Sequence, residues 1–480
     1  MKEMNFKSYQ KTKRPIKILQ FGQGNFLRAF ADDFIDQLNK NNLYDGSVLA
    51  VKTTARGTLD DFKEQNCLYT LCTRGVENGE IVNTSKIIEC IHGVFSTNEE
   101  PEKLAQAAVI PSLQVIISNT TEAGIALVEA DRYEDMPISF PAKLCKLLYL
   151  RFSAYGCDDD KGLYIIPTEL IEANGDKLRE CVLTQARLWN LGEAFEGWIN
   201  KYCHFYNTLV DRIVSGYPKS NEVFENLGYA DPLCDVCEPF GLWVLQGDES
   251  LKEVLPLHKA QPAAVFCDDI TPYRDRKVRI LNGAHTSFSP LGVIMGLETV
   301  KDCVDHPEVR KFLEKLLETE IKPYVKLPKD EVDSFTESVL ERFSNPYLDH
   351  AIIGICLNSV SKFKARLLDS FKDYYNDKNS IPKLISFSFA ALLRFYSLDE
   401  SFNGITDTQK PYTAKDNLEV LKKMQCYSTL STEEYVKKAA SETEFWGMDL
   451  GEFKDFIPTV AEFLDLIKKD ASKALKEVLK

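Results

Sequence analysis

The chain has 480 residues, of which 44% are hydrophobic and 27% charged, and it carries a net charge of −14. This length exceeds what one hydrophobic core organises, so two or three domains are expected. The negative charge argues against nucleic acid or an anionic membrane as the partner, and an anionic small substrate would need a local basic pocket. No apolar run approaches the ~18 residues of a membrane span, and we expect no secretory signal because no apolar segment follows the basic first residues.

The cysteines indicate a reducing compartment. There are 13 of them, an odd number scattered along the chain, which favours reduced thiols in a cytoplasmic protein. Cys234 and Cys237 have the spacing of half a zinc site, but no second pair follows at a matching distance and His258 stands alone. We therefore predict two ordinary thiols there and no metal site.

The first ordered pattern is a strand, a glycine turn and a helix. Residues 15–21, PIKILQF, form a short apolar run that ends at Gly22, and Gly24 follows two residues later. Residues 25–39 then place apolar side chains at helical spacing. In this context glycines allow the backbone to approach a pyrophosphate. Leu27 stands where a third glycine is usual, and a simple turn is the alternative interpretation.

Residues 47–52, SVLAVK, predict the second strand. A ribose-binding carboxylate is expected at the end of such a strand, yet the chain continues with Lys52, two threonines, an alanine and Arg56. These two cations could also meet a 2′-phosphate. The residues themselves thus leave the choice between NAD and NADP open.

Residues 86–95 and 115–118 predict further buried strands, separated by a helix within residues 99–108. The second strand runs into SNTTEAG, residues 118–124, a small polar loop where a doubly wound sheet contacts its ligand. An N-capped turn is the alternative for this loop. Arg28, in the helix after the glycine turn, either contacts a phosphate or is an ordinary solvated residue. The predicted cofactor site comprises Phe21, Gly22, Gly24, Asn25, Phe26, Arg28, Asn119 and Thr120.

The next segment pairs a helix at 140–152 with a buried strand at 162–166. Asn174 follows this strand, just before a helix that opens near Gly175. Its amide is either a group aimed at the substrate oxygen or a helix cap.

Residues 192–216 predict one long helix. Its internal charges Asp211 and Arg212 are adjacent and cannot share one helix face. Either one of them turns inward to a partner, or both lie on the rim of the apolar stripe. The irregular stretch 217–265 predicts the last sheet elements and a linker.

Residues 268–290, DDITPYRDRKVRILNGAHTSFSP, hold the candidate catalytic residues Lys277, Asn282 and His285. In an α-helix, at ~100° per residue, His285 lies about 80° and Asn282 about 140° around the axis from Lys277, so the three share one side. A cation, an amide and an imidazole together suit ketone–alcohol chemistry, because they can exchange a proton with the substrate oxygen, hold it and position it. A surface helix with a capping asparagine is the alternative.

The neighbours Ile280 and Leu281 favour a packed helix over a solvated one. A lysine that acts as a base near neutrality needs burial or a nearby positive charge to favour its neutral form. The candidate positive neighbours are Arg274, Arg276 and Arg279.

After this stretch the chain becomes helical in pattern. The predicted helices cover residues 308–325, 331–343, 352–371, 381–396, 417–425 and 433–440. We therefore predict an α/β protein with a Rossmann-like doubly wound sheet domain at 1–271 and a mainly helical substrate domain at 272–480. Within the helical part, RFSNPYLDH and NSVSKFKAR gather positive side chains that are either solvated or available to a substrate carboxylate. The candidates are Arg342, His350, Lys362 and Arg366.

Several blocks in this order resemble the mannitol dehydrogenase family of polyol-specific long-chain dehydrogenases. They include ILQFGQGNFLRAF, SNTTEAG, PTELIEANGDKLRE, LVDRIVSGYP and DDITPYRDRKVRILNGAHT. The resemblance covers most of the chain, and its most specific element is the Lys277, Asn282, His285 pattern, which it identifies as the catalytic lysine and two assistants. A CDN-like triplet of mannitol dehydrogenases is replaced here by Thr168, Glu169 and Leu170, so that asparagine is not carried over.

SNTTEAG and LNGAHT look more like the uronate-reducing branch of that family. The resemblance implies metal-independent, NAD(H)-dependent, reversible reduction of D-tagaturonate to D-altronate in hexuronate catabolism. Fructuronate reduction and mannitol or hexitol oxidation are alternatives within the family. A nucleotide-sensing regulator without catalysis is the alternative of another class.

Overall fold

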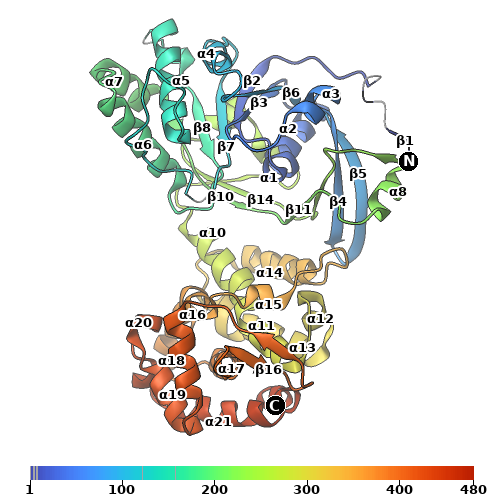
Figure 1. Cartoon of the computed structure of the whole chain (residues 1–480), viewed down its shortest axis with the longest axis vertical. Coiled ribbons are helices and arrows are strands. Elements are labelled where there is room, and N and C mark those ends of the chain that lie inside the picture. Colours follow the sequence, from blue (N-terminus) through green and yellow to red (C-terminus); the bar gives the residue numbers. More distant parts are fainter. Residues whose placement is uncertain (1, 4–5, 7–8, 122, 157) are drawn as a thin grey trace. The chain divides into compact units, whose positions relative to one another are not determined.

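The computed structural model describes residues 2–3, 6, 9–121, 123–156 and 158–480 (Figure 1). The chain forms two compact units, the first from residues 1–74 and 81–270 and the second from residues 75–80 and 271–480. The division into two domains between residues 271 and 272 stays a prediction. Among the described residues, no helix combines the length and the apolar character that crossing a membrane requires.

The first unit is built on a six-stranded parallel sheet with the strand order β6-β3-β2-β7-β8-β9. Its strands are β2 (Ile16–Phe21), β3 (Ser47–Lys52), β6 (Ile91–Ser96), β7 (Val115–Ser118), β8 (Tyr164–Pro167) and β9 (His204–Phe205). Their side chains are mostly buried, as in a parallel sheet that is covered on both faces. The strands predicted at 15–21, 47–52, 115–118 and 162–166 are confirmed.

Helices cover both faces of this sheet (Figure 1). They are α1 (Asn25–Ala29), α2 (Ala31–Lys40), α3 (Asp60–Glu64), α4 (Glu102–Ala108), α5 (Phe140–Tyr155), α6 (Asn174–Leu188) and α7 (Glu193–Tyr202). The core on one face contains α1 and α2, and the core on the other contains α4 to α7. This arrangement confirms the predicted Rossmann-like architecture.

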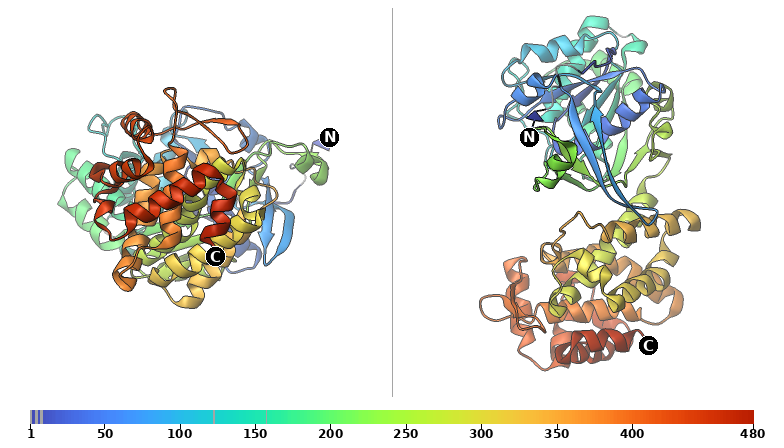
Figure 2. Two further views of the ribbon diagram at one scale, coloured as in Figure 1. Left: turned by 90° about the horizontal axis from the view of Figure 1, so that it is seen from below. Right: turned by 90° about the vertical axis from the view of Figure 1, so that its right-hand side faces the viewer.

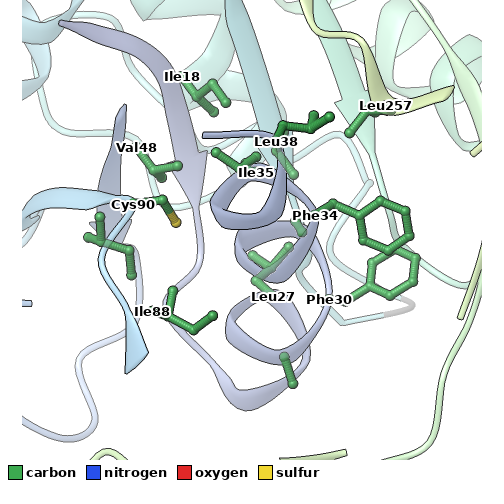
Figure 3. Packing of buried hydrophobic residues seen from close by; sticks show 14 of the residues in the cluster. Ile18, Leu27, Phe30, Phe34, Ile35, Leu38, Val48, Ile88, Cys90 and Leu257 are labelled. Atoms are coloured by element: carbon green, nitrogen blue, oxygen red, sulfur yellow. The ribbon is translucent and has the colours of Figure 1, made fainter. Parts of the chain in front are cut away.

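The helix predicted at 25–39 is present but bends at Phe30, which separates α1 from α2. In Figure 3, Ile35 and other apolar residues of these helices turn toward the sheet, where Ile18 and Val48 lie. Phe30 and Phe34 project from another side, and their rings pack against Trp243 at centroid distances of 5.1 and 5.4 Å. The glycine turn is thus followed directly by a helix, α1, that packs into the core of the first unit.

Smaller sheets complete the first unit, except that residues 75–80, in a hairpin of one of these sheets, belong to the second unit. One has the order β10-β14-β15, and another has the order β11-β13-β4-β5. Their strands are β10 (Asn207–Asp211), β14 (Leu242–Gln246), β15 (Val265–Cys267), β11 (Val214–Gly216), β13 (Asp235–Cys237), β4 (Tyr69–Glu77) and β5 (Glu80–Ile88). The short strands β1 (Lys2–Glu3) and β12 (Tyr229–Ala230) pair with each other, and the short helices α8 (Glu222–Leu227) and α9 (Leu251–Val254) lie in the connections.

Two sequence-based expectations are wrong. The long helix at 192–216 ends at Tyr202, and β9, β10 and β11 follow, because the β-branched residues after it pack better in a pleated surface than on a helix. Arg212 turns inward, and its Nη1 donates to Ala29 O and to an oxygen of Asp33, each at 2.8 Å. The segment 86–95 belongs to two different strands, β5 and β6, and β5 is largely exposed.

The second unit is mainly helical (Figures 1 and 2). Its helices are α10 (Thr271–Arg276), α11 (Gly283–Met295), α12 (Val300–Asp305), α13 (Pro307–Leu316), α14 (Lys329–Phe343), α15 (Ile352–Ile355), α16 (Ser359–Lys378), α17 (Lys383–Phe395), α18 (Leu418–Ser428), α19 (Thr432–Ala440), α20 (Thr443–Trp446), α21 (Phe456–Lys469) and α22 (Ala471–Val478). A two-stranded sheet, β16 (Asn403–Ile405) with β17 (Pro411–Thr413), interrupts them. Helices α11 and α17 are buried on almost every side and form the centre of the unit. The predicted helical character is confirmed, and α12, α20, α21 and α22 are additional to the prediction.

The first unit contains a buried carboxyl that should make its stability depend on pH. Asp32 is fully buried on α2, where Gln20 Nε2 and the Tyr69 hydroxyl approach one of its oxygens at 3.4 Å. Burial raises the pKa of Asp32 to about 7. Because the folded state resists ionisation of this group, its contribution to stability is complete at acidic pH and is lost as the pH rises through about 7.

We expect Asp32→Asn to remove this part of the pH dependence, which amounts to up to about 4 kcal/mol. The measurement is the urea midpoint of the native chain and of Asp32→Asn between acidic and mildly alkaline pH. The native midpoint should fall more steeply with rising pH, and parallel curves for the two proteins would contradict the assignment.

Candidate functional site

The first unit brings two of the predicted loops together at one edge of its sheet. From β2 the chain builds β3 and β6 on one side and then β7, β8 and β9 on the other, so the topology reverses between β2 and β7. Phe21 and Ser118 are paired in register, and Asn119 N–H donates to Phe21 O at 3.2 Å. In doubly wound sheets, ligands bind at the carboxyl ends of strands at such a reversal.

The glycine turn leaves room for a ligand. Gly22 has φ +126°, and a Cβ there would lie 2.9 Å from Leu27 Cδ1 and 3.2 Å from Asn119 O, so only glycine fits without strain. A Cβ at Gly24 would meet no atom within 4 Å, and Gly24 and Asn25 are exposed. Phe26 is half-buried, and its ring stacks on Phe30 at 5.0 Å. Close backbone packing beside an open turn suits the pyrophosphate of a dinucleotide.

Arg28 points into the first unit. Its guanidinium donates to Leu233 O, donates to Asn25 Oδ1 at 2.6 Å and forms an ion pair with Asp235 at 3.4 Å. Burial raises the pKa of Asp235 to about 7, and the charge of Arg28 acts in the opposite direction. These contacts favour a structural role, and a phosphate contact by Arg28 stays a prediction.

The polar loop after β7 is organised by a buried carboxylate. Glu169 accepts from the backbone N–H of Thr120 at 2.9 Å, from its hydroxyl at 3.0 Å and from Ser118 Oγ at 3.1 Å. Asn119 Nδ2 donates to Thr168 O and Oγ1, both at 3.0 Å. Glu169 therefore fixes the loop that carries two predicted cofactor residues.

Asn174 is buried, and its amide is used within the first unit. Nδ2 donates to Glu169 O at 3.0 Å and to Thr208 Oγ1 at 3.1 Å, and Oδ1 accepts from the N–H groups of Gly175 at 2.9 Å and Thr208 at 2.8 Å. These bonds connect the end of β8, the start of α6 and β10. They favour a structural role, and substrate binding by Asn174 stays a prediction.

The predicted catalytic residues lie on a helix that changes its winding. Residues Lys277–Asn282 form a π-helical turn between α10 and α11. A π turn links residues five apart, and Lys277 and Asn282 have that spacing, so the turn brings them closer in azimuth than an α-helix would. Both side chains are half-buried. Such turns within α-helices are frequent at functional sites.

Two of the arginines beside Lys277 have partners of their own. Arg276 forms an ion pair with Glu331 at 3.7 Å and lies 4.4 Å from the ring centroid of Phe335. Arg279 pairs with Asp373 at 2.5 Å. Their positive charges are therefore partly compensated by neighbouring carboxylates.

His285 lies at the centre of the buried part of this site. Its ring is nine-tenths buried and packs on Phe343 at a centroid distance of 4.3 Å, with His350 at 5.3 Å. Nε2 is enclosed and has no hydrogen-bond partner among the described residues. Burial lowers the pKa of His285 well below its usual range, and the nearby groups His350, Arg342, Arg366 and Lys362 lower it further.

The four basic side chains predicted from two separate motifs thus converge on His285. Arg366 Nη1 donates to Thr286 Oγ1 at 3.2 Å, and Lys362 Nζ donates to Ile355 O at 2.7 Å. Among the described residues, no carboxylate lies within ion-pair distance of either Arg366 or Lys362. Burial lowers the pKa of both, which for Lys362 is reinforced by the charge of Arg366. Arg366 and Lys362 therefore carry positive charges that no described carboxylate compensates at ion-pair distance.

A glycine permits this arrangement. A Cβ on Gly283 would lie 3.2 Å from Arg366 O and 3.4 Å from Leu367 Cδ2, so its absence allows α16 to approach the helix that carries His285. Phe343 and Thr286 were not predicted as site residues. The position of Phe343 directly after Arg342 in the RFSNP block was the only signal in the sequence that pointed to it.

We expect His285 to remain neutral throughout the physiological pH range, because burial and the surrounding cations oppose its protonation. The measurement is NMR of the chain with ¹³C-labelled histidine rings, with the His285 signal identified by its loss in His285→Asn. The signal should stay at the neutral-imidazole position from about pH 5.5 to about pH 8. A titration near the ordinary value of ~6.5 would show that the ring is not shielded in this way.

The described residues contain no group of three or more His, Cys, Asp and Glu side chains placed to hold a metal ion. Cys234 Sγ lies 3.9 Å from Cys72 Sγ, and Cys237 Sγ lies 3.9 Å from Thr73 Oγ1. The two cysteines of the sequence motif therefore have different neighbours.

Comparisons with known proteins cover both units. A family model described as mannitol dehydrogenase Rossmann domain matches residues 16–259, and one described as mannitol dehydrogenase C-terminal domain matches residues 269–468. An altronate oxidoreductase of Bacillus subtilis (strain 168) is 41% identical over 471 residues, covering 97% of this chain and 96% of the relative. An altronate oxidoreductase of Escherichia coli O7:K1 is 39% identical over 477 residues, covering 97% of each chain.

Two solved structures share the fold. Pseudomonas fluorescens mannitol 2-dehydrogenase, in a ternary complex with NAD and D-mannitol, aligns with a TM-score of 0.68 at 20% identity, over 98% of this chain and 96% of the other. A substrate-free D-sorbitol dehydrogenase aligns with a TM-score of 0.80 at 22% identity, over 96% and 95% of the two chains. Since family models match both units and full-length relatives are 39–41% identical, the chain belongs to the mannitol dehydrogenase family.

Proposed function

We propose that this chain is an NAD(H)-dependent oxidoreductase that interconverts D-tagaturonate and D-altronate in hexuronate catabolism. The observation that carries the proposal is the full-length similarity to altronate oxidoreductases of two bacteria. The cationic surroundings of His285 support it, because they suit a sugar acid better than a neutral polyol.

The residues of the first unit fit a dinucleotide. The glycine turn at Gly22, the open space at Gly24 and the loop of Asn119 and Thr120 lie at the reversal of strand order where such ligands bind. When bound, the dinucleotide supplies or accepts the hydride at the ketone carbon. The choice of NAD(H) over NADP(H) is part of the proposal.

In the second unit, Lys277 donates a proton to the substrate oxygen during reduction and removes it during oxidation. The amide N–H of Asn282 donates a hydrogen bond to the same oxygen as it gains negative charge. His285 acts as a neutral ring that positions the oxygen, since its surroundings oppose protonation. The π turn, which sets the relative azimuth of Lys277 and Asn282, supports these roles.

The substrate carboxylate binds to the group of basic side chains formed by Arg342, His350, Lys362 and Arg366, in which burial lowers the pKa of His350 and so favours its neutral form. Arg366 is the strongest candidate, because a guanidinium can hold a carboxylate with two parallel hydrogen bonds and no described carboxylate pairs with it. A cytoplasmic location is also part of the proposal, and the twelve described cysteines, all free thiols, favour it.

The test is a spectrophotometric screen that follows the absorbance of NADH. The substrates for reduction are D-tagaturonate, D-fructuronate and D-fructose. Mannitol and a mannitol phosphate are tested in the reverse direction, as substrates for oxidation. We expect the highest kcat/KM for D-tagaturonate. Faster turnover of another substrate would reassign the chain within its family, and dinucleotide binding without turnover of any of them would indicate a regulator.

A further inference from the structure

An ion pair lies at the carboxyl edge of the main sheet, on the side of β2 opposite to β7. Lys52 ends β3 and is paired in register with Ser96, which ends β6. Glu99 follows three residues later, and its Oε1 lies 3.5 Å from Lys52 Nζ. The ends of β3 and β6 are thereby joined by opposite charges.

The two partners differ in their access to solvent. The side chain of Lys52 is 1% exposed, whereas that of Glu99 is 59% exposed. Apart from the ion pair, Lys52 Nζ is enclosed and has no hydrogen-bond partner among the described residues. A buried ammonium is costly unless it is paired, so Lys52 holds Glu99 in place. A ligand arriving at this edge can reach the Glu99 carboxylate but not the Lys52 ammonium.

The position of this pair indicates what the carboxylate binds. In dinucleotide-binding sheets the second strand usually ends in an acidic residue that accepts a hydrogen bond from the adenosine ribose. Here β3 ends in a lysine, so that carboxylate is missing from its ordinary place. Glu99 supplies a carboxylate to the same region from the turn that follows the neighbouring strand β6.

We propose that Glu99, held by Lys52, accepts hydrogen bonds from the adenosine ribose hydroxyls of NAD(H) and thereby selects against NADP(H). The inference rests on the proposed function, because it names a contact of the same dinucleotide. An ionised carboxylate is acceptor-only, so it suits the ribose hydroxyl groups and repels a 2′-phosphate in their place.

The experiment is a fluorescence titration of the full chain with NADH and with NADPH, which measures binding without turnover. Glu99→Gln should raise the Kd for NADH by about 10-fold, the effect of losing one charge-assisted hydrogen bond, and should leave or lower the Kd for NADPH. Glu102→Gln, an exposed acidic position on α4, is the matched control and should change neither Kd. A cooperative thermal transition shows that each variant is folded, and the midpoint of Glu99→Gln should be lower than that of the native chain because the buried Lys52 loses its partner.

The inference would be overturned if Glu99→Gln bound NADH with the Kd of the native chain, or if the Kd for NADH and the Kd for NADPH rose by the same factor. Either result would leave the proposed function intact. A lower Kd for NADPH with an unchanged Kd for NADH would also overturn the ribose contact, since Glu99 would then act only by repelling the 2′-phosphate. If the native chain binds neither dinucleotide, the proposed function itself fails.

Discussion

Replacing Lys277 by alanine should lower kcat for NADH-dependent reduction of D-tagaturonate by about 10²- to 10⁴-fold. This is the usual range for a group that transfers a proton in the transition state. Lys277 stands at the start of the π turn, half-buried, at the spacing from Asn282 that such a turn brings together. The measurement is steady-state kinetics in both directions, because a single acid–base group should affect reduction and oxidation alike.

The matched control for this change is Lys311→Ala on α13, an exposed lysine of the same unit, which should retain native kinetics. Dinucleotide binding, measured by fluorescence, should be unchanged in Lys277→Ala because its predicted site lies in the first unit. A variant that reduces D-tagaturonate near the native rate would remove Lys277 from the mechanism.

The second large effect is expected at Arg366. Arg366→Gln should lower kcat/KM for D-tagaturonate by about 10²-fold, since truncating one partner of a hydrogen-bonded charge pair in a partly buried site costs a few kcal/mol. The neutral ketose D-tagatose has a hydroxymethyl group in place of the carboxylate, so its turnover should change little. The ratio of kcat/KM for the two substrates therefore measures carboxylate recognition separately from chemistry.

Lys364→Gln provides the control for Arg366, because Lys364 is an exposed cation on the same helix and only two residues away. It should leave the substrate ratio unchanged. Equal losses on D-tagaturonate and D-tagatose in Arg366→Gln would show that Arg366 supports the structure of the site and does not bind the carboxylate. Lys362 and Arg342 would then be the next candidates.

The parallel sheet was predictable because its strands are short apolar runs bounded by glycine or polar turns, as at 15–21 and 47–52. The segment 192–216 was mispredicted for a physical reason. Its apolar residues suit either a helix or a half-buried strand, and the choice depends on the surfaces that cover them. The bend at Phe30 was likewise invisible in a pattern that is helical throughout.

The sequence by itself determined the fold class, the glycine turn and the order of the chemical groups, because these depend on local spacing and composition. Only the tertiary structure decided which charged and polar side chains bind other residues of the chain and which remain available to bind a ligand. Arg28 and Asn174 are bound by their own unit, whereas Arg366 and Lys362, on α16, converge on a buried His285. Burial and the approach of distant helices set these environments, and neither is encoded in the spacing of residues along the chain.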